Sequence, residues 1–341
     1  MHTLRALPDR QGALQLREKA PEMNLWLMVA LGLVILLLAG DALVKGAVNL
    51  ALRIGIPALI VSLTIVAFGT SAPELLISVN AVLADKPGLA LGNVVGSNTA
   101  NVLLVLGIPA ILAVMHTSSC DCRRSYLQML AASVLFIALA FRGVFDWIAG
   151  LVLLGGLALM LGDAFHRSMI HRREVAAAKL LDDVEEVEGA DPDMPWWQIG
   201  VFLTLGLIGL PLGADILVDN ASILAVRYGV SEAVIGLTLV AVGTSLPELA
   251  TTVMAALRKQ ADVALGNVIG SNIFNLLAII GVTALVGRVP VNAEFLSFDL
   301  WVMLAASLVL IPFVFFGRDI GRLWGIALTA GYAGYVVTVL T

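Results

Sequence analysis

Two blocks of this chain recur at a constant offset of 174 residues, and both lie within long apolar stretches. Residues 69–75 read GTSAPEL and residues 243–249 read GTSLPEL; a second block follows each, ALGNVVGSN in one half and ALGNVIGSN in the other. Each GTSxPEL block carries one carboxylate, Glu74 or Glu248. An unpaired carboxylate in a bilayer costs on the order of several kcal/mol, so it marks a functional site by default. The duplication predicts one site shared between two related halves.

The composition is that of a membrane protein. Of the 341 residues, 60% are hydrophobic and 13% charged, and the mean hydropathy is +0.97. A soluble chain of this length would carry about 25% charged residues. Near-uninterrupted apolar stretches of roughly 17–25 residues are typical of transmembrane helices. We therefore predict an all-α polytopic membrane protein, and we expect no nucleic-acid partner because no basic patch is interleaved with aromatic residues.

Ten apolar stretches predict ten transmembrane helices, five on each side of a charged linker. They lie near 24–45, 57–83, 89–115, 124–141, 146–165, 197–219, 231–257, 262–286, 297–316 and 323–340. The predicted organisation is a polar N-terminal tail (1–23), a first five-helix repeat (24–165), a charged cytoplasmic linker (166–196) and a second five-helix repeat (197–341). Because five is odd, homologous halves enter the membrane from opposite sides, which gives inverted-topology repeats.

The loop charges predict the orientation. With the N-terminus outside, the inner loops hold Arg53, Arg123, Arg124, Arg167, Arg172, Arg173, Lys179, Arg258, Lys259, Arg318 and Arg322. The outer loops then hold Lys86, Arg142, Arg227 and Arg288. Since cytoplasmic loops carry the excess of Lys and Arg, the N-terminus is expected outside, although the basic N-terminal tail argues the other way.

The second predicted helix combines oxygen ligands with a helix break. Thr70, Ser71 and Glu74 lie at spacings of three and four, so their side chains share one face. Pro73 lacks an amide proton and clashes with the carbonyl of Gly69, which should break or kink the helix. Freed carbonyls at membrane depth are tolerated only where they are buried in protein or line a wet cavity.

The seventh predicted helix repeats this set with Thr244, Ser245, Pro247 and Glu248, with the freed carbonyl at Gly243. Carbonyls, hydroxyls and a carboxylate make an all-oxygen site, which suits hard cations, above all Ca²⁺ and also Na⁺.

The third and eighth predicted helices each carry one polar stripe. The stripes consist of Asn93, Ser97 and Asn101 in the first half and of Asn267, Ser271 and Asn275 in the second. Each stripe should face the interior, and a GxxxG pair beside it (Gly92 and Gly96; Gly266 and Gly270) should let a neighbouring helix approach closely. The alternative interpretation is structural, because Ser, Thr and Asn also serve as hydrogen-bonding contacts between transmembrane helices.

Other polar residues were given structural interpretations. Asp41 has Lys45 one turn on and is expected to form an intrahelical ion pair, in an interfacial role. Cys120 and Cys122, with His116 and Asp121 nearby, lack a four-ligand set at zinc spacing. The acids of the linker (182–193) lack calcium-loop spacing and predict a solvated segment.

At the duplicated blocks the sequence resembles the cation/Ca²⁺ exchanger superfamily, especially prokaryotic sodium/calcium exchangers. The resemblance covers both halves, most strongly residues 40–107 and 214–281. It implies ten helices in two inverted repeats, with ion sites in the middle of the membrane. It also implies Glu74 and Glu248 as the central Ca²⁺ ligands. The remaining implied ligands of Na⁺ and Ca²⁺ are Thr70, Ser71, Thr244, Ser245, Ser97, Asn101, Ser271 and Asn275.

The sequence departs from the family's pattern at one place. Several members have Asp at one of the two last positions of the GSNxxN blocks, whereas this chain has Asn101 and Asn275. Only two carboxylates then remain at the centre, which balance one Ca²⁺, whereas three Na⁺ leave an excess positive charge in a low dielectric. Dependence on K⁺ is not expected, because the K⁺-dependent branch resembles one with Asp at such a position.

The resulting hypothesis is a secondary antiporter in a prokaryotic inner membrane that exchanges Ca²⁺ for Na⁺ as a monomer, with no cofactor besides the transported ions. A Ca²⁺/H⁺ antiporter is the nearest alternative, since buried carboxylates protonate readily. A passive cation channel is a third hypothesis. An enzyme is not expected, because the central helices lack histidine and neither HExxH nor GxSxG occurs.

Overall fold

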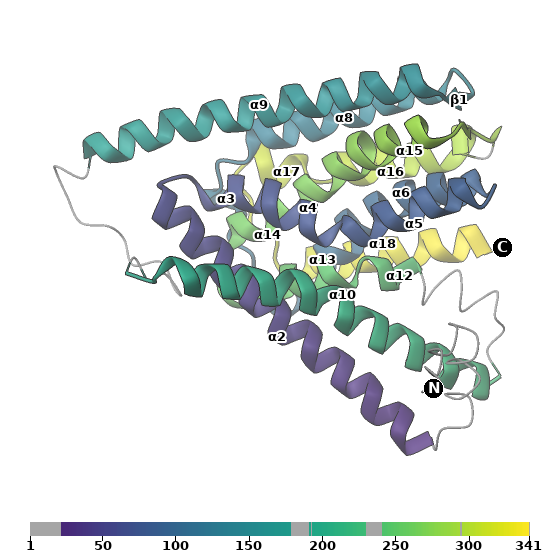
Figure 1. Ribbon diagram of the computed structural model, residues 1–341, viewed down its shortest axis with the longest axis horizontal. Coiled ribbons are helices and arrows are strands. Elements are labelled where there is room, and N and C mark those ends of the chain that lie inside the picture. Colours follow the sequence, from purple (N-terminus) through teal and green to yellow (C-terminus); the bar gives the residue numbers. More distant parts are fainter. Residues whose placement is uncertain (1–21, 179–190, 192, 230–240, 294, 341) are drawn as a thin grey trace, which may run out of the picture.

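The computed structural model describes residues 22–178, 191, 193–229, 241–293 and 295–340, and these are almost entirely helical (Figure 1). The first half contains α2 (Glu22–Ile54), α3 (Ala58–Val61), η1 (Ser62–Val66), α4 (Ala67–Thr70), α5 (Ala72–Leu83), α6 (Pro87–Ala100), η2 (Asn101–Val105), α7 (Gly107–Leu112), η3 (Thr117–Ser119), α8 (Arg123–Ala140), β1 (Val144–Phe145) and α9 (Trp147–Ala178). The second half contains α10 (Trp196–Arg227), α12 (Ala241–Thr244), α13 (Leu246–Leu257), α14 (Ala261–Ile273), η5 (Phe274–Ile279), α15 (Ile280–Val286), β2 (Val289–Pro290), η6 (Phe295–Asp299), α16 (Leu300–Leu308), α17 (Ile311–Phe315) and α18 (Arg322–Leu340). The segment η3 is a 3₁₀ turn and the other η segments are π-helical.

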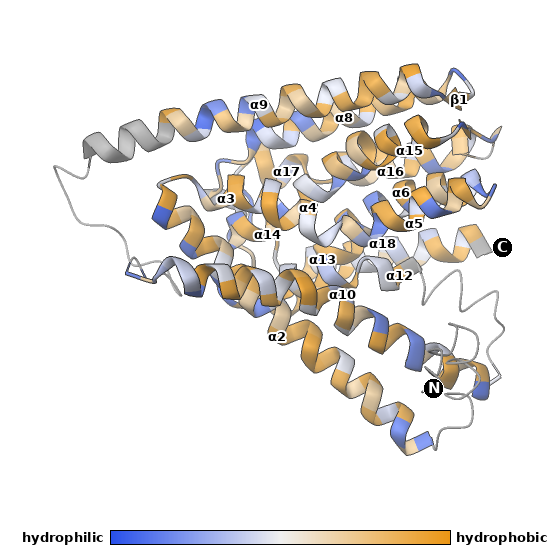
Figure 2. Ribbon diagram, in the orientation of Figure 1, coloured by the Kyte–Doolittle hydropathy of each residue, from blue (hydrophilic) through white to orange (hydrophobic). Residues whose placement is uncertain are grey.

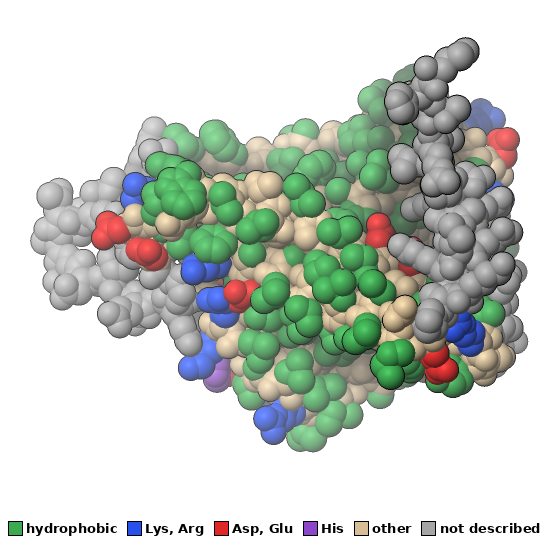
Figure 3. Space-filling view, turned by 60° about the horizontal axis from the view of Figure 1, so that its bottom comes forward, with side chains coloured by type: hydrophobic (Ala, Val, Ile, Leu, Met, Phe, Trp, Pro, Cys, Tyr) green, Lys and Arg blue, Asp and Glu red, His purple; other side chains and the backbone are tan. Residues whose placement is uncertain are grey.

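Six of the described helices are long and apolar enough to cross a membrane, and a bent pair, α3–α4 with α5, makes a seventh. Of the three other predicted spans, α8 and α18 occupy 124–141 and 323–340, and the first part of 231–257 lies outside the described residues. The surface fits a bilayer: Figure 2 shows apolar residues along the helices, and Figure 3 shows charged side chains mainly at the two ends of an apolar band. The chain is a multi-pass membrane protein.

Two of the helices that run further than the sequence suggested, α2 and α10, are terminated by a glycine. The helix α2 ends at Ile54, not at 45, because Gly55 takes φ +71° and its N–H bonds to the carbonyl of Ala51 at 2.9 Å. Gly229 ends α10 in the same way, with φ +81°. Only glycine adopts this left-handed conformation without strain, which explains why the two positions match in the repeat.

The helix α9 continues to Ala178, so the first part of the predicted linker is helical. Arg, Glu and Ala there are good helix formers, and a polar helix can extend past the bilayer. Most of the acidic window at 182–193 lies outside the described residues.

The helices α2 and α10 pack against each other along the lower edge of Figure 1, and their shared core includes Val61, Val66 and Ala250 of the main stack. A Cβ at Gly32 would lie 2.7 Å from the backbone nitrogen of Leu217, and one at Gly206 would lie 2.5 Å from Cβ of Leu43. The glycines thus allow backbone contact between the two helices.

Short β pairs join the two halves at both ends of the stack. At one end β1 pairs antiparallel with β2, and Val144 lies opposite Pro290. At the other end Met115 bridges Ile320. Each pair connects a loop of the first half to a loop of the second, which holds the halves in register.

The predicted Asp41–Lys45 ion pair is wrong. Arg258, which follows α13, places Nε 2.6 Å from Oδ1 of Asp41, while Nζ of Lys45 lies 4.7 Å from the centre of the Phe202 ring. Because a guanidinium binds a carboxylate more directionally than an ammonium does, the tertiary partner replaces the one on the same helix.

Candidate ion-binding site

Both predicted helix breaks are present. Ser71 separates α4 from α5 with φ −87° and ψ 4°, and the helix axis bends there by 43°. Ser245 separates α12 from α13 with φ −90° and ψ 4°. Pro73 and Pro247 each fall in the first turn of the new helix, where the missing N–H would have no partner in any case.

The serine at each break does not cap the helix that follows it. The S-x-x-E spacing of Ser71 and Glu74 is that of a capping box, in which the serine hydroxyl bonds to the start of its own helix. Instead, Ser71 makes no cap bond, and its Oγ donates to Oε1 of Glu248 in the other half at 3.0 Å. The hydroxyl is therefore directed into the interior, where it joins the two halves.

Both glutamates are buried, at 1% exposure each, in the middle of the helix stack. Each lies in the first turn of its helix, where the helix dipole favours a negative charge. The two carboxylates repel each other, and neither belongs to any ion pair between described residues. Among the described residues, no group of three or more His, Cys, Asp or Glu side chains could hold a metal ion.

An asparagine fixes the position of each glutamate. Asn93 Nδ2 donates to the carbonyl of Glu74 at 3.2 Å and to Oγ of Ser78 at 3.0 Å. Asn267 repeats both bonds in the second half. Its Nδ2 donates to the carbonyl of Glu248 at 3.3 Å and to Oγ1 of Thr252 at 3.1 Å. Two of the residues predicted to face the interior therefore join neighbouring helices: Asn93 joins α6 to α5, and Asn267 joins α14 to α13.

Buried polar atoms without a hydrogen-bond partner occur on the two glutamates and on several residues of the duplicated blocks. Among the described residues they include Oε2 of Glu74 and Glu248, Oδ1 of Asn98 and Asn101, Oγ of Ser245 and Ser271, and both amide atoms of Asn275. A buried polar group without a partner costs roughly 1–3 kcal/mol. Most of these atoms are oxygens, the ligand type that hard cations prefer.

The other predicted residues lie in the same region. Thr70 is buried, with Oγ1 3.4 Å from Oδ1 of Asn267; Ser97 is also buried, and Thr244 is half-buried. Gly69 and Gly243 have a packing role as well. A Cβ would lie 2.0 Å from Leu207 at Gly69 and 2.6 Å from Val218 at Gly243, so both glycines allow α10 to pack closely over the breaks.

An asparagine pair that was not predicted from the sequence lies at the contact between α6 and α14. Asn98 Nδ2 donates to the carbonyl of Asn272, and Asn272 Nδ2 to the carbonyl of Asn98, both at 3.4 Å. Asn101 Nδ2 also donates to Oδ1 of Asn272 at 3.1 Å. Each member also points at a methionine sulfur, Met303 or Met129, and these two residues are again related by the repeat offset. The asparagine of each duplicated GSN could have indicated this pair.

The two last asparagines of the predicted stripes lie in π-helical turns. Asn101 begins η2 and Asn275 is the second residue of η5. A π-helical turn widens the helix locally and frequently lies at a functional site. Here it follows the polar stripe in both halves.

The GxxxG prediction holds in the second half. A Cβ at Gly270 would lie 2.4 Å from the carbonyl oxygen of Leu63, and one at Gly266 would lie 2.8 Å from that of Leu59. In the first half, Gly92 meets only the ring of Phe295, at 3.7 Å, among the described residues. The stretch expected opposite it by repeat symmetry lies largely outside them.

A broken-helix pair with two buried carboxylates and many neutral oxygens defines a membrane cation transporter. Residues 24–162 and 199–341 match the family described as sodium/calcium exchanger protein. The chain therefore belongs to the sodium/calcium exchanger family, whose members are cation/Ca²⁺ antiporters of the membrane.

Relatives and solved structures agree with this assignment. The sodium/calcium exchanger MaX1 of Methanosarcina acetivorans is 35% identical over 348 residues, which cover 92% of this chain and 98% of that protein. The inner membrane protein YrbG of Escherichia coli is 33% identical over 308 residues, covering 89% and 93%. A structure of the sodium-calcium exchanger NCX_Mj, soaked with 10 mM Na⁺ and no Ca²⁺, superposes with a TM-score of 0.77 at 31% identity, covering 93% and 99%.

Proposed function

We propose that this protein exchanges Ca²⁺ for Na⁺ across the membrane, and that Glu74 and Glu248 form the shared binding site. One observation carries the proposal. Two buried glutamates follow repeat-related helix breaks, and a hydrogen bond from Ser71 in the first half to Glu248 in the second joins the two halves. Two carboxylates neutralise one Ca²⁺ or two Na⁺, so the two cargoes compete for one charge balance. The names of MaX1 and NCX_Mj favour the same pair of ions.

The neutral oxygens would complete the coordination of the transported ions. We assign this role to the hydroxyls of Thr70, Ser71, Ser97, Thr244, Ser245 and Ser271, the amide oxygens of Asn101 and Asn275, and the carbonyls of Gly69 and Gly243. The buried acceptors without partners support the assignment, because Ca²⁺ takes six to eight oxygen ligands and two carboxylates supply at most four.

The two halves would form inverted repeats of five helices each, ten in all, that alternate between outward-open and inward-open states. We place the N-terminus outside and the 166–196 segment in the cytoplasm, on the distribution of Lys and Arg. A monomer suffices in this proposal, since one chain contributes both glutamates. The membrane would be a prokaryotic inner membrane, as the name of the Escherichia coli relative indicates for that protein.

Protons are the second candidate for the driving ion. Asn101 and Asn275 leave the centre with two carboxylates only, and two protons balance their charge as well as two Na⁺ do. This observation keeps a Ca²⁺/H⁺ antiporter as the alternative function.

The experiment is ⁴⁵Ca²⁺ uptake into proteoliposomes loaded with Na⁺ and diluted into Na⁺-free buffer at equal pH. We expect uptake that requires internal Na⁺ and disappears in Glu74→Gln and Glu248→Gln. Uptake driven only by a pH step would replace Na⁺ with H⁺. Uptake that needs neither gradient and survives both substitutions would contradict the proposal and indicate a passive channel.

A further inference from the structure

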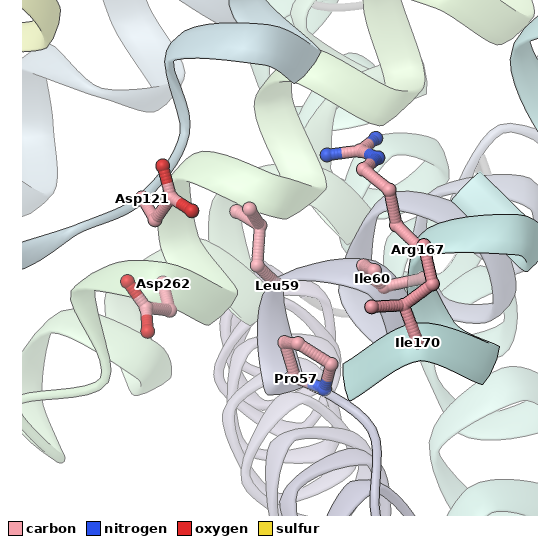
Figure 4. A pocket seen from close by; sticks show the side chains of 7 residues that line it. All are labelled: Pro57, Leu59, Ile60, Asp121, Arg167, Ile170 and Asp262. Atoms are coloured by element: carbon pink, nitrogen blue, oxygen red, sulfur yellow. The ribbon is translucent and has the colours of Figure 1, made fainter. Parts of the chain in front are cut away.

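A cavity lies at the end of the stack where α3 begins, and neither glutamate lines it. Its volume is about 250 Å³. The lining residues come from α3, α9, α14 and the loop before α8 (Figure 4); they are Pro57, Leu59, Ile60, Asp121, Arg167, Ile170 and Asp262. The proposed exchange does not use this cavity.

Opposite charges line opposite sides of the cavity. Figure 4 shows the carboxylates of Asp121 and Asp262 on one side and the guanidinium of Arg167 on the other, with Leu59 between them. An occupant that fits this arrangement carries a positive group and a negative group on one short scaffold, with an apolar part next to them.

The Arg167 side has a positive charge in excess. Asp163 pairs with Arg167 at 3.1 Å, but it also binds Arg124 and accepts a bond from Gln128 at 2.8 Å. One carboxylate is thus shared by two guanidinium groups. The remaining bonds of Arg167 go to neutral oxygens of Ser125 and Gln128, at 3.4 and 3.5 Å. These bonds use Nε and Nη2 of Arg167, so among the described residues Nη1 is left to donate a charge-assisted hydrogen bond to a phosphate.

The cavity lies next to the ends of two apolar stretches. Arg167 follows the apolar stretch 146–165, and Pro57 directly precedes a candidate membrane span that begins at Ala58. Ile170 is 44% exposed on the outer surface of α9, next to Arg167 in the cavity wall. An apolar chain can lie along this surface while a polar head enters the cavity, which favours a lipid over a soluble molecule.

We propose that this cavity binds the headgroup of phosphatidylethanolamine. The phosphate binds Arg167, the primary ammonium donates to Asp121 and Asp262, and the glycerol and acyl chains lie along Ile60 and Ile170. Phosphatidylglycerol has the phosphate but no ammonium, and its negative charge would face two carboxylates. Phosphatidylcholine has a quaternary ammonium that cannot donate N–H bonds to either one.

The test is native mass spectrometry of the delipidated full-length protein, titrated with each of the three phospholipids carrying identical acyl chains. Because hydrogen bonds between charged groups are weakened by solvent when they are half-exposed, we expect roughly threefold to tenfold tighter binding of phosphatidylethanolamine than of phosphatidylcholine. Asp262→Asn should reduce the preference for phosphatidylethanolamine over phosphatidylcholine. Asp121→Asn, which changes an exposed side chain, should reduce it as well. Arg167→Gln should weaken the binding of phosphatidylethanolamine and of phosphatidylcholine, because both carry the phosphate.

The matched control is Arg142→Gln, which removes a guanidinium from an ion pair with Asp146 at the other end of the helices and should change nothing. Equal binding of phosphatidylethanolamine and phosphatidylcholine would overturn the proposal. A preference for phosphatidylethanolamine that survives both Asp121→Asn and Asp262→Asn would also overturn it. Displacement of the lipid by equimolar glycerophosphoethanolamine would show that a soluble ligand occupies the cavity, which would also refute it. Na⁺-driven Ca²⁺ uptake by the same variants tests the proposed function separately.

Discussion

Replacing Glu248 by Gln should weaken Ca²⁺ binding far more than Na⁺ binding. The substitution keeps the shape of the side chain and removes one of two charges at a position that is 1% exposed. At an effective dielectric constant of about 20, two unit charges about 4 Å apart interact by about 4 kcal/mol, and a divalent ion doubles this. If half of this interaction energy contributes to binding, the substitution lowers the binding free energy of Ca²⁺ by about 4 kcal/mol and that of Na⁺ by about 2 kcal/mol. These values correspond to roughly a thousandfold loss of affinity for Ca²⁺ and a thirtyfold loss for Na⁺.

The assay is equilibrium binding of ⁴⁵Ca²⁺ and ²²Na⁺ to the purified protein in detergent, with Glu74→Gln measured in parallel. Asp319→Asn makes the same carboxylate-to-amide change in a loop and should alter neither affinity. A loss of less than tenfold for Ca²⁺ would refute the electrostatic argument. Equal losses for the two ions would also refute it, since they would indicate a distorted site and not a missing charge.

Three further substitutions test the packing around the site. Asn272→Ala should lower the free energy of unfolding by about 2–3 kcal/mol, because it removes the donor to the Asn98 carbonyl and the acceptor of the Asn101 amide. A fluorescence melting curve measures this. Gly270→Ala should lower the free energy of unfolding by about 1–3 kcal/mol or prevent folding, because its Cβ would lie 2.4 Å from the carbonyl oxygen of Leu63. The control is Gly155→Ala, whose Cβ would have no neighbouring described atom within 4 Å, and it should be neutral in the same expression and melting assay. Arg258→Gln should lower the melting temperature by a few degrees at low salt, an effect that 1 M salt should reduce because the pair with Asp41 is half-exposed.

Features governed by local chemistry were predictable from the sequence. The breaks at Ser71 and Ser245 follow from the missing amide of a proline two residues later, and this holds in any tertiary context. The burial of the glutamates also followed from their position in apolar stretches. Their role as ion ligands stays a prediction until the binding experiments are made.

Features that depend on a distant partner were not predictable. The pairing of Asn98 with Asn272 exists only after α6 and α14 meet, and one sequence does not say which face of each helix does so. The ion pair of Asp41 failed for the same reason, since Arg258 reaches it from another helix. Helix ends were misplaced because they depend on the φ angle of Gly55 and on polar residues that remain helical outside the apolar stretch.

The hydrogen bond from Ser71 to Glu248 has a consequence for the transport cycle. Its counterpart by repeat symmetry would run from Ser245 to Glu74, yet Oγ of Ser245 has no partner in the described part of the chain. The two GTSxPEL blocks are thus alike in sequence but unequal in contact. In an exchanger that turns over by swapping the conformations of its halves, the opposite-facing state would form the Ser245 bond and release that of Ser71. The two serines would then report, by which hydroxyl is engaged, which side of the membrane the site faces.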